Sequence, residues 1–214
     1  MIQRMEILQI NLGRSRAASA QLEQTCSELN PSLVCIQEPY VWDEKIVGIP
    51  IKFRVVSSIT PKTAIIIREK DCTIFPLLIK QNIVAIECSF QDKVIIIINV
   101  YISPTVDLND TLVELDGVIR QCQNKSVILT GDFNAKNIIW GGNVIDERGE
   151  QLSEFFLLHN IFLINDKDSE ATFQSSNGTS WIDLSLASGE LIAQVTHWDV
   201  LDNESLSDHK YISF

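Results

Sequence analysis

Residues 127–134 read Val-Ile-Leu-Thr-Gly-Asp-Phe-Asn, an apolar run that ends in a glycine, an acid and an amide. A short run of apolar and β-branched residues bounded by turn-forming residues predicts a buried β-strand. Such a strand would carry Asp132 and Asn134 to the edge of a sheet, where polar side chains do not burden the core.

The same pattern, a short strand that ends in a polar residue, recurs at three earlier places. Asn11 follows a run at 8–10, Glu38 one at 34–37, and Tyr101 one at 98–100. Taken singly, each fits a turn, a loop entry or a strand-end cap, and Asp208-His209 fits a surface pair. Their joint occurrence favours one shared site, because polar strand ends can converge on one rim of a sheet sandwich.

Strand candidates outnumber helix candidates along the chain. The predicted strands are 7–11, 33–37, 53–57, 64–68, 83–90, 93–102, 127–132, 162–165, 181–186, 195–201 and 211–214. The predicted helices are 15–29, 108–122 with Asp107 as its cap, and 147–159. This ratio favours a layered α/β sandwich with two sheets over a doubly wound fold, and without repeats or linkers we expect 1–214 to form a single domain.

Composition places the chain among ordinary globular proteins. It is 45% hydrophobic and 21% charged, which argues against disorder. Residues 1–6 lack the apolar stretch of a signal peptide, and the longest apolar runs are too short to span a membrane, so we expect a soluble protein without a membrane partner. The cysteines are odd in number and none forms a C-x-x-C pair, which indicates free thiols in a reducing compartment rather than a zinc site or a disulfide framework: Cys26, Cys35, Cys72, Cys88 and Cys122.

The net charge of −11 is concentrated in the second half of the chain. Residues 1–107 hold 11 basic and 11 acidic side chains, whereas residues 108–214 hold 6 basic and 17 acidic ones. Taken alone, this balance argues against a nucleic-acid partner. The asymmetry also suggests that some of these acids serve a purpose other than solubility.

Six motifs occur in a fixed order: Gln9-Ile10-Asn11, Gln37-Glu38-Pro39-Tyr40, Asn99-Val100-Tyr101, Gly131-Asp132-Phe133-Asn134-Ala135, Trp181-Ile182-Asp183-Leu184 and Ser207-Asp208-His209. In this order they resemble the endonuclease/exonuclease/phosphatase superfamily, and within it the apurinic-like endonuclease domain of non-LTR (LINE-type) retrotransposons. The resemblance implies a four-layer α/β sandwich, with two packed mixed β-sheets flanked by helices.

Further stretches resemble the arthropod branch of these elements, which inserts into ribosomal DNA or telomeric repeats. They are Asn134-Ala135-Lys136 with Trp140-Gly141, Asp146-Glu147-Arg148-Gly149 with Gln151-Leu152, and Thr172-Phe173 with Asn177-Gly178. The resemblance covers 7–214.

The resemblance implies catalytic roles for Asn11, Glu38, Tyr101, Asp132, Asn134, Asp183, Asp208 and His209. Glu38 would be the principal ligand of Mg²⁺, or of Mn²⁺ in its place, with Asn11 beside it and Asp208 completing the metal site.

The same resemblance implies a role for each of the other catalytic residues. Asp132 would orient and deprotonate the attacking water, which Asn134 helps to position. His209, held by Asp183, would donate to the scissile phosphate, and Tyr101 would contact that phosphate. The chemistry is consistent, because a histidine beside a carboxylate retains its proton and a divalent cation offsets clustered acids. We interpret His159 and His197 as structural.

The candidate DNA contacts are Arg14, Lys136, Thr172, Gln174, Asn177 and Ser180, and the alternative for Lys136 is a solvated loop residue. Thr172 and Ser180 resemble phosphate-contacting hydroxyls. Residues 174–179 between them predict a hairpin, because Asn-Gly suits a two-residue turn with positive φ. In the family, this hairpin varies with the target, and the alternative is a plain surface hairpin.

The implied activity is the nicking of one strand of double-stranded DNA in the nucleus. The 3′-hydroxyl would prime a reverse transcriptase domain of the same polyprotein, so we expect these residues to be a monomeric fragment of it. The alternatives are a cellular abasic-site repair endonuclease, a superfamily phosphatase acting on inositol lipids or sphingolipids, and an inactive relic that only binds DNA or a partner.

The charge distribution predicts weak non-specific binding to DNA. After Asp132, Asp183 and Asp208 are assigned to the site, 14 of the 17 acids in the second half remain, and Lys210 is the only basic residue after Lys167. We expect the affinity for random duplex, measured by fluorescence anisotropy, to be low and to fall further as salt is added. A tight complex that is insensitive to salt would contradict this expectation.

Overall fold

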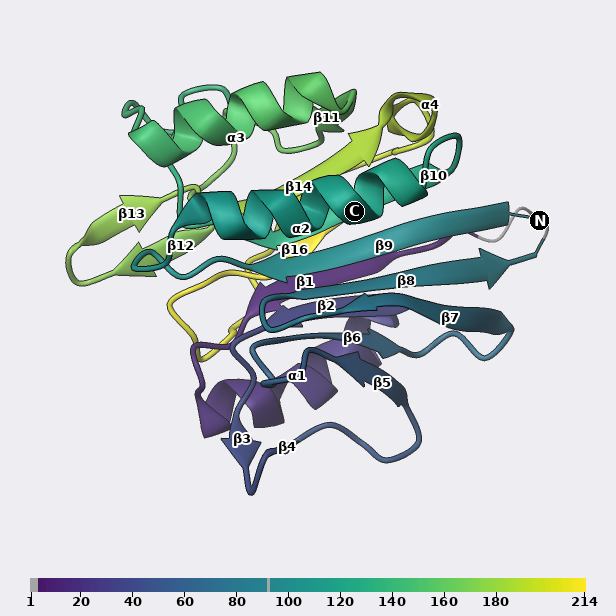
Figure 1. Ribbon diagram of the computed structural model, residues 1–214. Helices are drawn as coiled ribbons and strands as arrows, with labels where there is room; N and C mark the ends of the chain where they lie inside the picture. The colour runs from purple at the N-terminus through teal and green to yellow at the C-terminus, as the bar shows by residue number, and fades with distance from the viewer. Residues whose placement is uncertain (1–3, 92) are drawn as a thin grey trace.

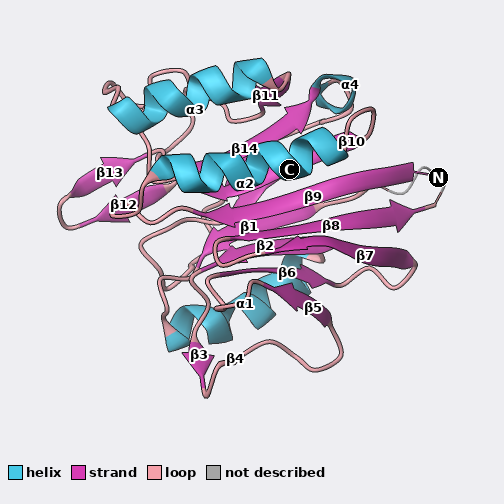
Figure 2. Cartoon of the chain, in the orientation of Figure 1, coloured by secondary structure: helices cyan, strands magenta, loops and turns pink. Residues whose placement is uncertain are grey.

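The computed structural model describes residues 4–91 and 93–214, so Met1–Gln3 of the N-terminal segment considered above lie outside it. Two six-stranded mixed sheets pack face to face, with helices on both outer faces (Figure 1 and Figure 2). The expected α/β sandwich is confirmed. None of the described helices is long and apolar enough to cross a membrane.

The first sheet has the strand order β15-β16-β1-β2-β6-β5. Its strands are β1 (Ile7–Asn11), β2 (Leu33–Gln37), β5 (Arg54–Ser57), β6 (Thr63–Ile67), β15 (Asp199–Val200) and β16 (Ile212–Ser213). β1 and β2 run parallel with Asn11 opposite Gln37, whereas the other neighbours are antiparallel. This pairing aligns the polar ends of β1 and β2.

The second sheet has the order β11-β14-β10-β9-β8-β7. Its strands are β7 (Cys72–Ile79), β8 (Ile83–Phe90), β9 (Lys93–Tyr101), β10 (Ser126–Asp132), β11 (Ile161–Leu163) and β14 (Asp183–Ser188). β9 and β10 are its parallel pair, with Tyr101 opposite Asp132, and Asp132 also lies opposite Asp183 of β14.

The helices are α1 (Arg16–Leu29), α2 (Leu108–Gln121), α3 (Glu147–Leu158) and the short α4 (Gly189–Ile192). The side chains of Ser15, Asp107 and Asp146 accept main-chain N–H groups at the starts of the first three helices, as N-caps do. The predicted helices are therefore confirmed within one residue at each end.

Three apolar clusters fill the interfaces between the four layers. Ile10, Leu22 and their neighbours pack α1 on the first sheet, and Leu115, Leu152 and theirs pack α2 and α3 on the second. A third cluster, which includes Ile65, lies between the sheets. The central strands are buried on both faces, which explains their continuous apolar sequences.

Two small hairpins project from the sandwich, one at the bottom and the other at the left in Figure 1. One is β3 (Val41–Trp42) with β4 (Lys45–Ile46), and the other is β12 (Phe173–Ser175) with β13 (Gly178–Ser180). The predicted hairpin at 174–179 is confirmed, but its turn lies one residue earlier than Asn-Gly suggested. Ser176 and Asn177 form the turn, and Gly178, with φ 134°, is the first residue of β13.

Several strand predictions were wrong in detail. β7 was missed because Pro76 lacks an N–H for a ladder, but β7 is an edge strand, where proline is tolerated. The predicted strand at 195–201 shrinks to Asp199–Val200, and the one at 181–186 begins only at Asp183. β3, β4 and α4 were not predicted.

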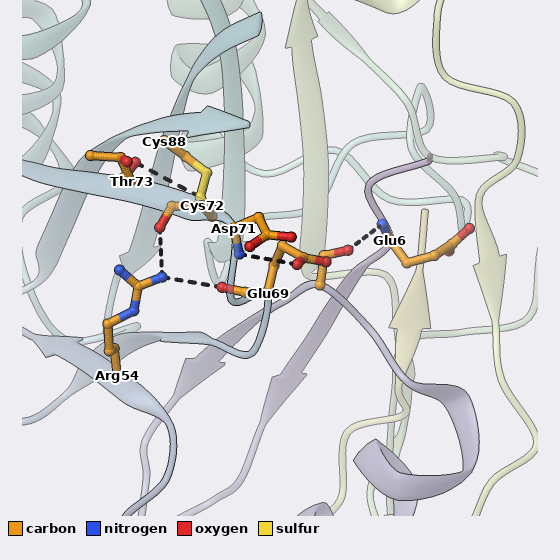
Figure 3. The surroundings of a disulfide bond; sticks show 8 residues. Glu6, Arg54, Glu69, Asp71, Cys72, Thr73 and Cys88 are labelled. Atoms are coloured by element: carbon orange, nitrogen blue, oxygen red, sulfur yellow. Dashed lines mark hydrogen bonds between the residues drawn. A yellow bond between two sulfur atoms is a disulfide. The ribbon is translucent and has the colours of Figure 1, made fainter. Parts of the chain in front are cut away.

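The expectation that every cysteine is a free thiol was also wrong. A disulfide joins Cys72 of β7 to Cys88 of β8 (Figure 3). The two strands are antiparallel neighbours, with Cys88 opposite Ile74, two residues from Cys72, so the two side chains lie on the same face of the sheet. Because β7 was not predicted, no expected strand pairing placed these two cysteines side by side. Cys26, Cys35 and Cys122 are free and buried.

Buried amides connect the two sheets beneath the rim. Gln9 Nε2 donates to the Gly131 carbonyl at 3.0 Å, and Gln9 Oε1 accepts from the Thr130 and Ser185 hydroxyls. Asn99 of β9 likewise donates to carbonyl oxygens of the first sheet, those of Ile36 and Ala64. These bonds fix how the ends of β10 and β14 sit against β1.

Replacing Gln9 by Met should destabilise the fold, because the Gly131 carbonyl and two buried hydroxyls lose their partner. We expect the free energy of unfolding to fall by about 2 kcal/mol, measured by urea denaturation. The control is Gln24→Met on the exposed face of α1, which should change it by less than about 0.5 kcal/mol. Equal effects of the two variants would contradict the role of the Gln9 amide.

Candidate active site

The polar ends of four central strands meet at one rim of the sandwich. Asn11 ends β1, Tyr101 ends β9 and Asp132 ends β10, while Glu38 directly follows β2. Because β1 pairs in parallel with β2 and β9 with β10, the strands of each pair end together. The hydrogen bond from Asn11 to Asp132 shows that the two pairs of ends lie at the same edge. The predicted convergence of polar strand ends is present in the structure.

Asp132 lies at the centre of this rim and is almost fully buried. Its Oδ2 accepts from Asn11 Nδ2 at 2.8 Å, across the gap between the sheets. Its Oδ1 accepts from both the main-chain N–H and the Nδ2 of Asn134, at 3.0 and 2.9 Å. Asn134 can reach twice because it has a φ of 46°, a conformation that side-chain-bearing residues adopt mainly where the surrounding structure enforces it.

Burial and charge make Asp132 a weaker acid than usual. Burial, and next the negative charge of Asp183, raise the pKa of Asp132 to about 7, although His209 and the two asparagines oppose the shift. A carboxylate with a pKa near neutrality can both accept and release a proton at physiological pH.

His209 is held by Asp183. The Nδ1 of His209 lies 3.0 and 2.8 Å from the two oxygens of Asp183, and its Nε2 lies 3.9 Å from Asp132 Oδ2. The Phe173 ring packs against the imidazole in a T-shaped arrangement, with 4.8 Å between centroids. Asp132, Asp183 and His209 form a buried group whose possible ligand atoms all lie within 4.8 Å of one another.

The ring of His209 is charged at neutral pH. Burial lowers its pKa, but the charge and hydrogen bond of Asp183, followed by the charge of Asp132, outweigh burial and raise the pKa to about 9. A protonated imidazole is a poor metal ligand, because a ligating nitrogen must have lost its proton. The buried group therefore resembles a hydrogen-bonded relay more than a metal centre.

Glu38 lies at the more open side of the rim. Its side chain is 17% exposed, accepts from Asn11 Nδ2 at 3.4 Å, and pairs with Arg14 at 2.6 Å. Glu38 has a positive φ of 43°, like Asn134. Burial, and next the charge of Glu38, raise the pKa of Tyr101, so its phenol remains protonated as a donor.

Two hydroxyls that sequence reasoning missed hold His209 in place. Ser205 Oγ donates to the His209 carbonyl at 2.6 Å. Ser207 Oγ donates to the Asn11 carbonyl at 2.7 Å and accepts the His209 N–H at 3.3 Å. Ser207 belongs to the Ser-Asp-His motif, but its link to Asn11 spans 196 residues and has no local signal.

The structure does not bring every predicted residue into this group. The Asp208 side chain is exposed and has no hydrogen bond to the other predicted catalytic residues described here; only its carbonyl is engaged, by the Gln174 N–H at 2.7 Å. Thr172 is fully buried, and its hydroxyl accepts the Asp183 N–H at 3.2 Å. Among the described contacts, Thr172 therefore supports Asp183 rather than facing solvent.

The other predicted DNA contacts surround the site. Arg14 is 69% exposed at the rim, and Lys136 is exposed in the loop after β10. On the hairpin, Gln174 and Asn177 are exposed and Ser180 is half-buried. A groove of about 540 Å³ is lined by residues of the hairpin and of the segment 201–210, with Gln174, Asp202, Asp208 and Lys210 among them.

Comparison with known proteins identifies this arrangement. A family model described as endonuclease-reverse transcriptase matches residues 95–213. The chain belongs to this family. It is 26% identical over 216 residues to the 115 kDa protein of the type-1 retrotransposable element R1DM of Drosophila melanogaster, and the match covers 96% of the chain and 21% of that protein. The chain thus spans about a fifth of this relative's length.

Solved structures agree with the family assignment. The endonuclease domain of TRAS1, a telomere-specific non-LTR retrotransposon, is 27% identical and superimposes with a TM-score of 0.90, covering 98% of the chain and 96% of that domain. An AP endonuclease from Leishmania major has a TM-score of 0.76 at 14% identity, covering 98% of the chain and 86% of that protein, which shows a shared fold alone. The resemblance to non-LTR retrotransposon endonucleases is confirmed, and the abasic-site repair alternative is not favoured.

The contact between Asp183 and His209 predicts a pH signature. Replacing Asp183 by Asn should lower the pKa of His209 from about 9, because burial then acts with less opposition. NMR titration of the imidazole signals in metal-free protein measures this shift, and Asp116→Asn, beside His159, is the matched control.

The same shift links to stability. Because the folded pKa of His209 lies above its ordinary 6.5, the protonated ring stabilises the fold fully below pH 6.5, and this contribution is lost as pH rises through about 9. A His209 pKa that Asp183→Asn leaves unchanged would contradict the assigned interaction.

Proposed function

We propose that this chain hydrolyses one phosphodiester bond in one strand of double-stranded DNA and leaves a 3′-hydroxyl and a 5′-phosphate. The observation that carries the proposal is the juxtaposition of Asp132, a buried carboxylate of near-neutral pKa, with a charged His209 held by Asp183. Membership in the endonuclease-reverse transcriptase family supports it.

Asp132 is the proposed base for the attacking water. Its carboxylate is fixed by Asn11 on one oxygen and by Asn134 on the other, so its orientation does not depend on the substrate. Its pKa of about 7 is suited to accepting a proton near neutral pH. Asn134, half-buried beside it, is placed to steady the same water or the phosphate.

His209 is the proposed donor to the scissile phosphate. Asp183 engages Nδ1, which leaves Nε2 as the nitrogen that a phosphate oxygen can approach. The charged ring stabilises the negative charge that grows on the phosphate during attack. The Tyr101 phenol is a second proposed donor from the end of β9.

The donor set fits a divalent cation of the hard, oxygen-preferring kind. Glu38 is the accessible carboxylate of the rim, and Mg²⁺ binds through one or two carboxylates together with water and substrate phosphate. Asn11 turns its Oδ1 to the Gly13 N–H at 2.8 Å and its Nδ2 to the two acids, so it orients these carboxylates. When bound by Glu38, Mg²⁺ or Mn²⁺ would neutralise phosphate charge and polarise the phosphodiester. Asp208 is a further proposed ligand, but its exposed side chain would have to rotate toward Glu38 to bind the same ion.

The proposed partners follow from the retrotransposon relatives. The 3′-hydroxyl would prime a reverse transcriptase domain elsewhere in the same polypeptide, and the site of action would be the nucleus. Arg14, Lys136, Gln174 and Asn177 are the proposed DNA contacts, because they are exposed around the rim and on the β12–β13 hairpin.

A plasmid-nicking assay tests the proposal. Supercoiled DNA with Mg²⁺ should be converted to the open-circular form, and EDTA should stop the conversion. Glu38→Ala and His209→Ala should each lower the rate by at least about 10²-fold, since each removes a group that acts on the transition state. The controls are Glu23→Ala on the exposed face of α1 and His197→Ala, which pairs with Glu6.

Each alternative gives a different result. Nicking that persists in EDTA, or that survives both catalytic substitutions, would refute the proposal. A strong preference for abasic over intact duplex would indicate a repair enzyme, and phosphate release from inositol lipid headgroups would indicate a phosphatase. DNA binding without metal-dependent cleavage would indicate an inactive relic.

A further inference from the structure

The segment Asp146-Glu147-Arg148-Gly149 contains the N-cap and the first residues of α3. It is hydrogen-bonded to the loop that carries Asn134. Asp146 Oδ1 accepts the N–H groups of Lys136 at 3.1 Å and of Gly149 at 2.7 Å, and the Asp146 N–H donates to the Lys136 carbonyl. A Cβ at Gly149 would stand 2.0 Å from the Lys136 carbonyl oxygen, so only glycine permits this approach. The start of α3 is thus locked to the loop after β10.

The Arg148 guanidinium adds to these contacts by donating hydrogen bonds to four main-chain carbonyl oxygens. Nε donates to Asn134 at 2.9 Å, and Nη2 donates to Phe133 at 3.3 Å. Nη1 donates to Val106 at 2.9 Å, and Nη2 donates also to Ser103 at 3.4 Å. Ser103 and Val106 lie in the loop that follows Tyr101 at the end of β9. One side chain therefore joins the loops behind two of the proposed catalytic residues.

The position of Arg148 in its helix is electrostatically unfavourable for a positive charge. It lies in the first turn of α3, where the helix dipole opposes positive charge. Within residues 4–91 and 93–214, no acidic side chain forms an ion pair with it. Its interactions are thus with main-chain carbonyls, and they require the planar fork of a guanidinium, which a lysine ammonium cannot reproduce.

We propose that Arg148 is a positioning residue for Asn134. By holding the Asn134 carbonyl, it keeps Asn134 at a φ of 46°, the conformation from which both its main-chain N–H and its Nδ2 reach Asp132 Oδ1. Among the described residues, Arg148 forms no hydrogen bond or ion pair with a proposed catalytic side chain. The inference rests on the proposed function only in that Asn134 and Asp132 act in DNA cleavage.

The first test does not depend on cleavage. Hydrogen exchange of the Asn134 amide, followed by NMR, reports whether its N–H remains bonded to Asp132. Arg148→Lys should expose this amide to exchange while the central strands remain protected. Arg120→Lys, on α2 and paired with Asp116, is the matched control and should leave the Asn134 amide protected. Retained protection in Arg148→Lys would overturn the proposal.

The second test is kinetic. Misplacement of Asn134 should lower kcat of nicking by about 10²-fold in Arg148→Lys, with KM changed less than about twofold. Because Arg148 acts through Asn134, combining Arg148→Lys with Asn134→Ala should cost little more than Asn134→Ala alone. Independent, multiplicative losses would show that Arg148 acts by another route and would overturn the proposal.

Folding and function are separated by two further readouts. Circular dichroism and thermal unfolding check that Arg148→Lys folds, and Arg148→Gln replaces it in both tests if it does not. If both variants unfold, Arg148 serves folding and the positioning role is refuted. A wild-type chain that fails to nick DNA would refute the proposed function, whereas exchange of the Asn134 amide would still decide the role of Arg148.

Discussion

The hydrogen bond from Asn11 Nδ2 to Asp132 Oδ2 crosses from one sheet to the other at the rim where the polar strand ends meet. Its 2.8 Å length requires β1 and β10 to end at the same height, and the buried amides of Gln9 and Asn99 enforce that alignment from below. The apolar layer between the sheets is not directional and could slide by a residue. Buried amides cannot slide without losing their partners, so they set the geometry of the rim.

Local signals account for what the sequence predicted well. Apolar runs bounded by turn residues located the central strands, and capping residues such as Asp107 located the helix starts. The convergence of Asn11, Glu38 and Asp132 could be anticipated because strand ends share an edge. Asp183 and His209, by contrast, are 26 residues apart, and their contact was implied by family resemblance rather than by spacing.

The missed features depend on tertiary packing, which local patterns do not reveal. Pro76 argued against a strand at 72–79, so neither β7 nor the pairing of Cys72 with Cys88 was predicted. Thr172 resembled a phosphate-contacting hydroxyl, but it is buried and accepts the Asp183 N–H instead. Asp208 and His209 are adjacent, yet only His209 is buried in the site, because successive side chains of an extended segment point to opposite sides. Pattern reading identifies residue types at an edge but does not decide which of two neighbours faces inward.

The β12–β13 hairpin is joined by main-chain pairing to the segment that carries His209. Phe173 forms a β-bridge with His209, the Gln174 N–H donates to the Asp208 carbonyl, and the Lys210 N–H donates to the Thr172 carbonyl. The tip at Ser176 and Asn177 lies beyond these bonds and is exposed. The tip can therefore be lengthened or changed without moving His209. A change at the root of the hairpin, Phe173 and Gln174, would alter both surface recognition and the position of His209. An exchange of hairpins between relatives should accordingly be cut beyond the root, so that the recipient keeps its own residues beside the histidine.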